Sequence, residues 1–178
     1  MLEVRYKKNN NLLEWLDAIV LALLVIVLLF TFGVRLCRVD GNSMNPGLVN
    51  GERVMISAWP YQANYGDVVV VDSYTPYGKP LVKRVIGKEG DEIDIDFGEG
   101  VVYRNGEALD EPYTAEPTYL KEENDFPMTV PEGNLFVMGD NRNHSSDSRS
   151  SMIGFIDERD VLGKALFRLF PFSKIGVL

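Results

Sequence analysis

One uninterrupted apolar run near the start of the chain limits what the rest can fold into. Residues 18–34, AIVLALLVIVLLFTFGV, carry no charge, and Trp15 and Leu16 extend the apolar stretch beyond Asp17. A helix rises 1.5 Å per residue, so about 20 residues cross a hydrocarbon core of roughly 30 Å. A buried core helix would be amphipathic, whereas this run is apolar all round. We therefore expect a transmembrane anchor over 15–35, preceded by a short tail over 1–14.

A cleaved signal peptide is the alternative for this segment. Such a peptide would have a shorter apolar core followed by a small-x-small cleavage site, and residues 32–36, FGVRL, offer none. We therefore expect the anchor to be retained. Its orientation stays open, because the basic residues Arg5, Lys7 and Lys8 on one side are balanced by Arg35 and Arg38 on the other.

Charge and composition exclude several classes of function. The net charge is −8, from 18 basic and 26 acidic residues, and the charges of residues 1–34 cancel. A nucleic-acid partner is not expected, because phosphate binding requires a basic surface. The chain has one cysteine, Cys37, and one histidine, His144. An intramolecular disulfide is therefore impossible, and a structural zinc site is not expected.

Beyond the anchor, segments rich in Val and Ile alternate with Gly, Pro and Asp, which predicts strands. The expected strands are 53–59, 67–74, 81–86, 91–97, 101–109, 134–139 and 161–170. The continuous VVVV of the second should be covered on both faces, and the alternating DEIDIDF should have one wet face. Asn105-Gly106 predicts a tight hairpin. The last segment could also be helical.

The Pro- and acid-rich segment 110–132 is expected to form an extended loop, and 92–132 is a candidate small subdomain. The predicted fold class is therefore mainly β. An N-terminal transmembrane helix precedes an antiparallel β domain over 36–178, which carries a small β excursion.

A turn-forming segment, DGNSMNPGL (40–48), surrounds Ser43 with residues that favour turns. It is either an ordinary surface turn or a turn that presents a nucleophile. A serine nucleophile requires a base. His144 is one candidate, in a triad with Ser43 and Asp140 or Asp147. Its alternative is an exposed loop histidine.

Lys83 is the second candidate base. On the expected strand 81–86 it shares a face with Leu81 and Val85. Desolvation on an apolar face lowers the pKa of a lysine and lets it act as a neutral base. The alternative is a lysine whose stem packs while its amine reaches water. Residue patterns by themselves leave both bases open.

Four segments in order add a family resemblance. They are GNSMNP (41–46), GERVMI (51–56), the region from GDVVV through KRVIGKEGD (66–91), and GDNRNHSSDSR (139–149). With the anchor before them, they make the chain resemble bacterial type I signal peptidases (leader peptidases) over nearly its whole length. That family consists of membrane-anchored serine proteases with a Ser-Lys dyad, so the resemblance implies a signal-peptidase-like antiparallel β-sheet catalytic domain.

The resemblance also implies roles for single residues. Ser43 is the nucleophile, whose backbone N–H serves as an oxyanion donor, and Lys83 is the general base. The hydroxyl of Ser145 orients the lysine amine, and Asp147 and Arg149 form a structural ion pair. The other expected site residues are Asp140 and Asn141, which shape the site, and Met44, Val39, Leu81 and Val82, which line the substrate pocket.

Two positions depart from the family pattern. Gly47 stands where the family usually has threonine, and Gly41 stands where some members have a serine that donates to the oxyanion. The identity of a second oxyanion donor is therefore open.

By this resemblance the chain cleaves signal peptides from exported preproteins, with no metal or cofactor. It is expected in the cell membrane as a single-pass protein, with its catalytic domain outside the cytoplasm and the lipid bilayer as a partner. A self-cleaving repressor-type protease would instead carry a DNA-binding domain before the dyad. The non-enzymatic alternative is an anchored β domain that binds an extracellular partner.

Overall fold

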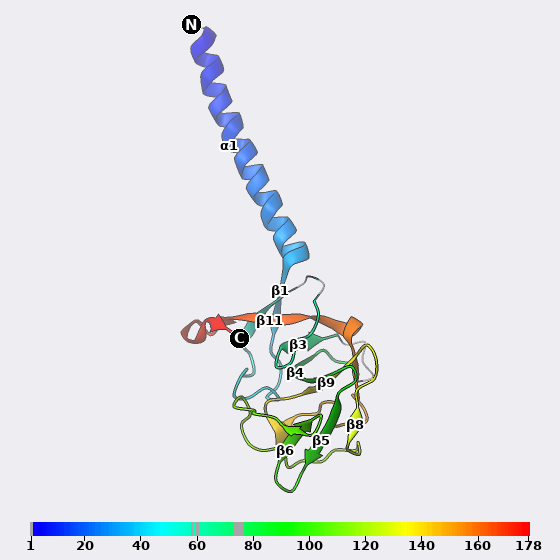
Figure 1. Cartoon of the computed structure of the whole chain (residues 1–178). Helices are drawn as coiled ribbons and strands as arrows, with labels where there is room; N and C mark the ends of the chain where they lie inside the picture. The colour runs from blue at the N-terminus through cyan, green and yellow to red at the C-terminus, as the bar shows by residue number, and fades with distance from the viewer. Residues whose placement is uncertain (1, 58, 60, 73–76) are drawn as a thin grey trace.

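The computed structural model describes residues 2–57, 59, 61–72 and 77–178. A single long helix, α1 (Leu2–Leu28), stands on a β domain (Figure 1). The helix contains no Gly or Pro, and its described side chains from Asn11 to Leu28 are all exposed. This segment is long and apolar enough to cross a membrane. The helix begins at Leu2, so most of the expected tail over 1–14 is helical.

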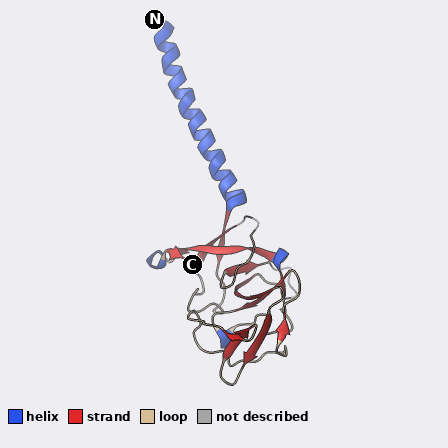
Figure 2. Cartoon of the chain, in the orientation of Figure 1, coloured by secondary structure: helices blue, strands red, loops and turns tan. Residues whose placement is uncertain are grey.

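The helix passes into the β domain without a flexible linker. A π-helical turn, η1 (Leu29–Gly33), is followed directly by strand β1 (Val34–Arg38). Figure 2 shows that nearly all regular structure after this point is strand, as the fold class predicted. The remaining helical pieces are the short 3-10 turns η2 (Arg142–His144), η3 (Glu158–Asp160) and η4 (Phe172–Lys174).

The larger sheet is antiparallel throughout and is assembled from distant parts of the chain. Its order is β1-β2-β11-β3-β4-β9-β10, with β12 paired to β11. Its further strands are β2 (Arg53–Ser57), β3 (Val68–Val71), β4 (Leu81–Lys88), β9 (Asn134–Met138), β10 (Ile156–Asp157), β11 (Val161–Phe170) and β12 (Gly176–Val177). The helical alternative for 161–170 is therefore wrong, because this segment is the central strand β11.

A smaller sheet is formed within residues 92–129. It has the order β7-β6-β5-β8, with β5 (Glu92–Asp96), β6 (Val101–Arg104), β7 (Glu107–Ala108) and β8 (Met128–Thr129). Asn105 and Gly106, with φ of 54° and 77°, connect β6 to β7, as the hairpin signal predicted. Between β7 and β8, residues 109–127 run as an irregular segment.

Three apolar clusters hold the domain together. Strand β3 joins two of them, because Val69 and Val71 pack into one and Val68 and Val70 into the other. This confirms that VVVV is covered on both faces. The third cluster lies under the smaller sheet, where Ile93 and Ile95 of β5 are buried between exposed acidic residues. The alternation of DEIDIDF is thereby confirmed.

Candidate active site

The turn that carries Ser43 is anchored to the core by the apolar side chains next to it in the sequence. Met44 and Leu48, each 1% exposed, lie in the same apolar cluster as Val68 and Val70 of β3. The backbone N–H of Leu48 donates to Met44 O at 2.8 Å, which closes the turn. The side chains around Ser43 are thus drawn into the core, while Ser43 itself stays half-buried at the surface.

Asn141 holds the same turn from the other side. Its backbone N–H donates to Ser43 O at 2.9 Å, and its side-chain Nδ2 donates to Asn42 O at 3.1 Å. Gly139 lies equally close, since a Cβ at this position would overlap both Ser43 O and Ser145 Oγ. The segment after β9 and the serine turn therefore pack backbone against backbone.

Lys83 reaches Ser43 from strand β4. It lies opposite Val69 of β3 and shares a buried face with Leu81 and Val85, as the strand pattern predicted. The lysine side chain is 3% exposed, and Nζ lies 2.7 Å from Ser43 Oγ. Burial lowers the pKa of Lys83 to about 8, against an opposing effect of the nearby Asp147 carboxylate. A neutral amine is therefore accessible at moderate pH, within hydrogen-bonding distance of a serine hydroxyl.

Ser145, Asp147 and Arg149 form a buried chain of hydrogen bonds. Ser145 Oγ donates to Asp147 Oδ2 at 2.9 Å. Arg149 donates to both carboxylate oxygens, from Nε at 2.8 Å and from Nη2 at 2.9 Å. Burial opposes ionisation of Asp147, but the hydrogen bonds and charge of Arg149 outweigh it and keep the pKa of Asp147 below its ordinary value. The pair therefore stays charged although both residues are fully buried.

Asp140 is engaged by the residue next to Lys83. Arg84 Nε donates to Asp140 Oδ1 at 2.8 Å and Nη2 to Oδ2 at 2.7 Å, while the guanidinium stacks over the ring of Tyr113. A Cβ on Gly47 would lie 2.6 Å from Asp140 Oδ2. The absence of a side chain at Gly47 therefore leaves space for this carboxylate. Sequence reasoning missed Arg84, although its alternation with Lys83 on β4 placed it on the other face.

A cleft of about 650 Å³ opens beside the Ser43–Lys83 pair. The expected wall residues Leu81 and Val82 line it. Val39 and Met44, also expected there, lie in the core cluster and are only 2% and 1% exposed. These two residues support the turn from below, and their contact with substrate stays a prediction.

The cleft also contains residues with polar side chains. His144 lines it, but the hydrogen bond recorded at Ser43 Oγ comes from Lys83. Tyr77, Lys79 and Ser146 line it as well, and sequence reasoning missed them. The one signal for Tyr77 and Lys79 was their place beside Gly78, just before the strand that carries Lys83.

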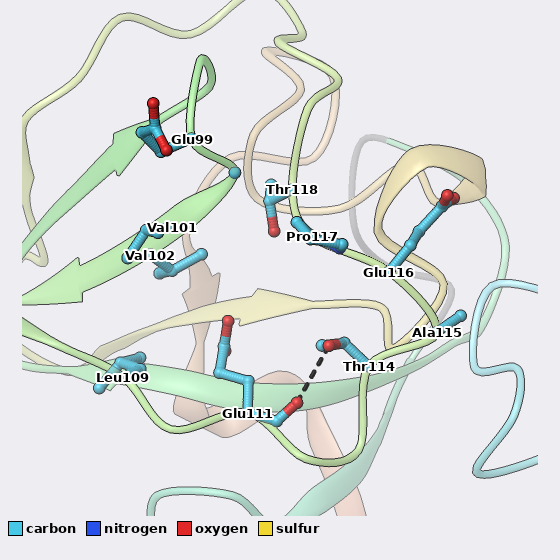
Figure 3. Close-up of a pocket in the computed structure, with 11 residues that line it drawn as sticks. Glu99, Val101, Val102, Leu109, Glu111, Thr114, Ala115, Glu116, Pro117 and Thr118 are labelled. Atoms are coloured by element: carbon cyan, nitrogen blue, oxygen red, sulfur yellow. Dashed lines mark hydrogen bonds between the residues drawn. The ribbon is translucent and has the colours of Figure 1, made fainter.

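A second pocket, of about 370 Å³, lies between the smaller sheet and segment 111–118 (Figure 3). Glu111 is among its lining residues, and Thr114 Oγ1 donates to Glu111 O at 3.0 Å, the dashed line in Figure 3. The carboxylate of Glu111 is occupied by the buried Arg142, with distances of 2.6 and 2.7 Å. This ion pair links the irregular segment 109–127 to the loop that follows β9. Within the described residues, no three His, Cys, Asp or Glu side chains are placed to hold a metal ion.

Comparison with known proteins places the whole chain in one family. Residues 12–170 match the family described as signal peptidase, peptidase S26. Signal peptidase I of Bacillus licheniformis is 38% identical, covering 94% of each chain. Signal peptidase IB of Staphylococcus aureus (strain N315) is 34% identical, covering 93% of each.

A solved structure is also similar. The crystal structure of a signal peptidase I from Enterococcus faecalis V583 is 31% identical, with a TM-score of 0.48, and it covers 58% of this chain and 97% of that one. Because the family match over residues 12–170 spans the anchor region and most of the β domain, and the first of these relatives covers 94% of each chain, this chain belongs to the signal peptidase family, peptidase S26.

Proposed function

We propose that this chain is a membrane-anchored serine endopeptidase that removes signal peptides from exported preproteins, with Ser43 as nucleophile and Lys83 as general base. The observation that carries the proposal is the 2.7 Å contact between Lys83 Nζ and Ser43 Oγ, made by a lysine that is 3% exposed. Membership of the signal peptidase family, and relatives named signal peptidase I, supply the class of substrate.

The reaction begins with Lys83 as the neutral amine. Lys83 Nζ takes the proton of Ser43 while Oγ attacks the scissile carbonyl carbon, and the carbonyl electron pair moves onto oxygen. We assign the backbone N–H of Ser43 as a donor to the resulting oxyanion, as the family resemblance implies. As the intermediate collapses, the C–N bond breaks and the Lys83 ammonium gives its proton to the leaving amine.

The second half of the reaction releases the acyl enzyme. Lys83, neutral again, takes a proton from a water that attacks the ester carbonyl carbon. Collapse of this second intermediate breaks the bond to Ser43 Oγ, which recovers its proton from the ammonium. One base therefore serves both halves, and the hydrogen-bonded chain of Ser145, Asp147 and Arg149 holds the region behind it in place.

The apolar helix supports a reaction at the membrane surface. Helix α1 is exposed from Asn11 to Leu28, a stretch with a mean hydropathy of 2.2, and residues 18–28 of it carry no charge, as in a bilayer-spanning segment. We place it across the cell membrane, with the β domain outside the cytoplasm. There the cleft lined by Leu81 and Val82 meets the cleavage sites of preproteins, whose small side chains fit a shallow apolar wall.

The test is cleavage of a purified preprotein by the full-length protein in detergent. We expect wild type to cleave it, Ser43→Ala and Lys83→Ala to be inactive, and the matched cleft variant His144→Ala to keep most activity. The double variant Ser43→Ala/Lys83→Ala should be no worse than either single, because the two groups act as one unit. An active Lys83→Ala protein with an inactive His144→Ala protein would replace the dyad by a triad. A wild type without cleavage would favour a non-catalytic binding domain.

A further inference from the structure

Residues 120–124 lie as a strap across the loop that holds the buried ion pair. Arg149 Nη1 donates to Leu120 O at 3.0 Å, at the start of the strap. At its end, Asn124 donates twice, from its backbone N–H to Arg149 O at 3.1 Å and from Nδ2 to Ser148 O at 3.0 Å. The strap is therefore fixed at both ends, which limits where the middle one of the three residues between these bonds can lie.

Glu122 is that residue, and its carboxyl group is unusually placed. The side chain is half-buried, and one carboxylate oxygen, Oε2, is shielded from solvent without a hydrogen-bond partner among the described residues. Burial, and then the negative charge of Asp147, raise the pKa of Glu122, whereas the cation of Arg149 and a hydrogen bond from the backbone of Asp147 lower it. A shielded, unpartnered carboxylate oxygen works against stability, and such groups concentrate at functional sites.

We propose that Glu122 is a positioning residue for the Ser43–Lys83 reaction: from the strap it adds a second carboxylate to the buried Asp147–Arg149 pair and so sets the charge felt by the Lys83 amine. This inference rests on the proposed function. Glu122 is not among the residues that line the cleft, so its effect on Lys83 is that of its charge, exerted beside the Asp147–Arg149 pair.

The charges that face Lys83 come from two parts of the chain. The loop after β9 contributes Asp147, Arg149 and Asp140, and the strap contributes Glu122. Arg149 favours the neutral amine of Lys83, while each of the carboxylates favours the ammonium. Around the buried pair, two carboxylates thus surround one guanidinium, and the excess is negative.

This excess has opposite effects on two stages of catalysis. Before reaction it favours the ammonium form of Lys83, which is inactive as a base. During proton transfer it stabilises the ammonium that forms as Ser43 is deprotonated. Without the charge of Glu122, Lys83 should become neutral at lower pH but should also be a weaker base.

The experiment compares full-length Glu122→Gln with the matched control Glu123→Gln. Glu123 is the exposed neighbour on the same strap, where its carboxylate accepts from Ser150 Oγ at 2.9 Å and from Ser151 N at 3.2 Å. The measurement is kcat/KM against pH on a soluble peptide in detergent. For Glu122→Gln we expect the acid limb to move to lower pH and the alkaline plateau to fall. For Glu123→Gln and for Glu122→Asp, which keeps the charge, we expect the midpoint of the limb to stay near that of wild type.

Several results would overturn the inference. They are a Glu122→Gln limb that coincides with wild type, a limb that moves equally in Glu123→Gln, and a Glu122→Gln protein that does not fold by circular dichroism. The last would assign Glu122 a structural role only. These failures differ from failure of the proposed function, in which wild type itself would leave the peptide uncleaved or Lys83→Ala would cleave it.

Discussion

The hydroxyl of Ser145 donates a hydrogen bond to Asp147 Oδ2 at 2.9 Å, and Arg149 Nη2 donates to the same oxygen. Gly139 donates its backbone N–H to that oxygen as well, at 3.0 Å, and packs against the carbonyl of Ser43. The hydroxyl of Ser145 is thereby fixed in direction behind the dyad. The arrangement suits a group that positions the lysine amine, because the hydrogen bond to Asp147 sets the direction of the Ser145 hydroxyl.

We therefore expect Ser145→Ala to lower kcat by roughly 100-fold with little change in KM, because orientation of Lys83 is lost while substrate binding is not. Steady-state kinetics on a soluble peptide gives both constants. Ser146→Ala is the control. Ser146 is the neighbouring serine and lines the cleft, but the hydrogen bond to Asp147 is donated by Ser145. A raised KM with unchanged kcat in Ser145→Ala would instead assign this serine to substrate binding.

Activity should rise with pH through about 8, the value to which burial lowers the pKa of Lys83. Below that pH the amine is protonated and cannot accept the serine proton, so kcat/KM should fall by about tenfold per unit. A histidine base would place the rise near pH 6.5. The profile should be the same in His144→Ala, and a limb near 6.5 that disappears in this variant would contradict the lysine base.

Lys83→Met should abolish cleavage and stabilise the fold. At pH 7 the buried lysine is protonated at a cost, and the difference between an ordinary 10.5 and about 8 corresponds to about 3 kcal/mol. Because the folded pKa is lowered, the penalty is complete below pH 8 and disappears as pH rises toward 10.5. Urea unfolding in detergent at pH 7 and pH 10 should show a gain for Lys83→Met that shrinks at the higher pH. An equal gain at both would argue against a charged, buried Lys83.

Gly139→Ala should inactivate the enzyme more than it unfolds it. The added methyl group would overlap Ser145 Oγ and the backbone oxygen of Ser43, so the nucleophile turn and the loop after β9 must separate. A displacement of about 1 Å at this point costs roughly 100-fold in rate. Gly176→Ala is the matched control, because a Cβ there meets nothing within 4 Å. Normal kcat in Gly139→Ala would show that the contact between the two segments is dispensable.

A fragment of residues 34–178 should fold and still bind lipid. The strands and their three apolar clusters lie entirely after Gly33, whereas Phe172 and Val177 near the C-terminus are 78% and 84% exposed. This C-terminal part lies at the end of the β domain that faces α1 (Figure 1). Flotation with liposomes should recover the fragment, and Phe172→Ser/Val177→Ser should reduce the recovery. A fragment that remains in the lipid-free bottom fraction would contradict the prediction.

The strands could be predicted wherever local pattern matched burial. Lys83 is an example, since alternation alone placed it on the face of Leu81 and Val85. Strand β1 could not be read in this way, because Val34–Arg38 is an edge strand with two exposed arginines and follows the apolar run directly. The strands β8, β10 and β12 have two residues each, too few to show any periodicity.

The site required information that lies far apart in the chain. Ser43 and Lys83 are 40 residues apart, and their approach depends on β3 and β4 pairing beside the serine turn. The family resemblance named both residues, but neither the resemblance nor the pattern indicated Glu122. Its position follows from hydrogen bonds between the strap and residues 148–149, which nothing in the local sequence announces.

Because α1, η1 and β1 follow one another without a break, the position of the β domain along the helix axis is fixed. Val34 begins β1 and pairs with Ser57 of β2, so the first residue after the π-helical turn is already part of the sheet. A five-residue strand spans about 17 Å, and Ser43 follows it by a short turn. If α1 spans the bilayer as proposed, Ser43 is held at a set height above the lipid. Cleavage would then depend on the distance of a peptide bond from the membrane as well as on the side chains around it.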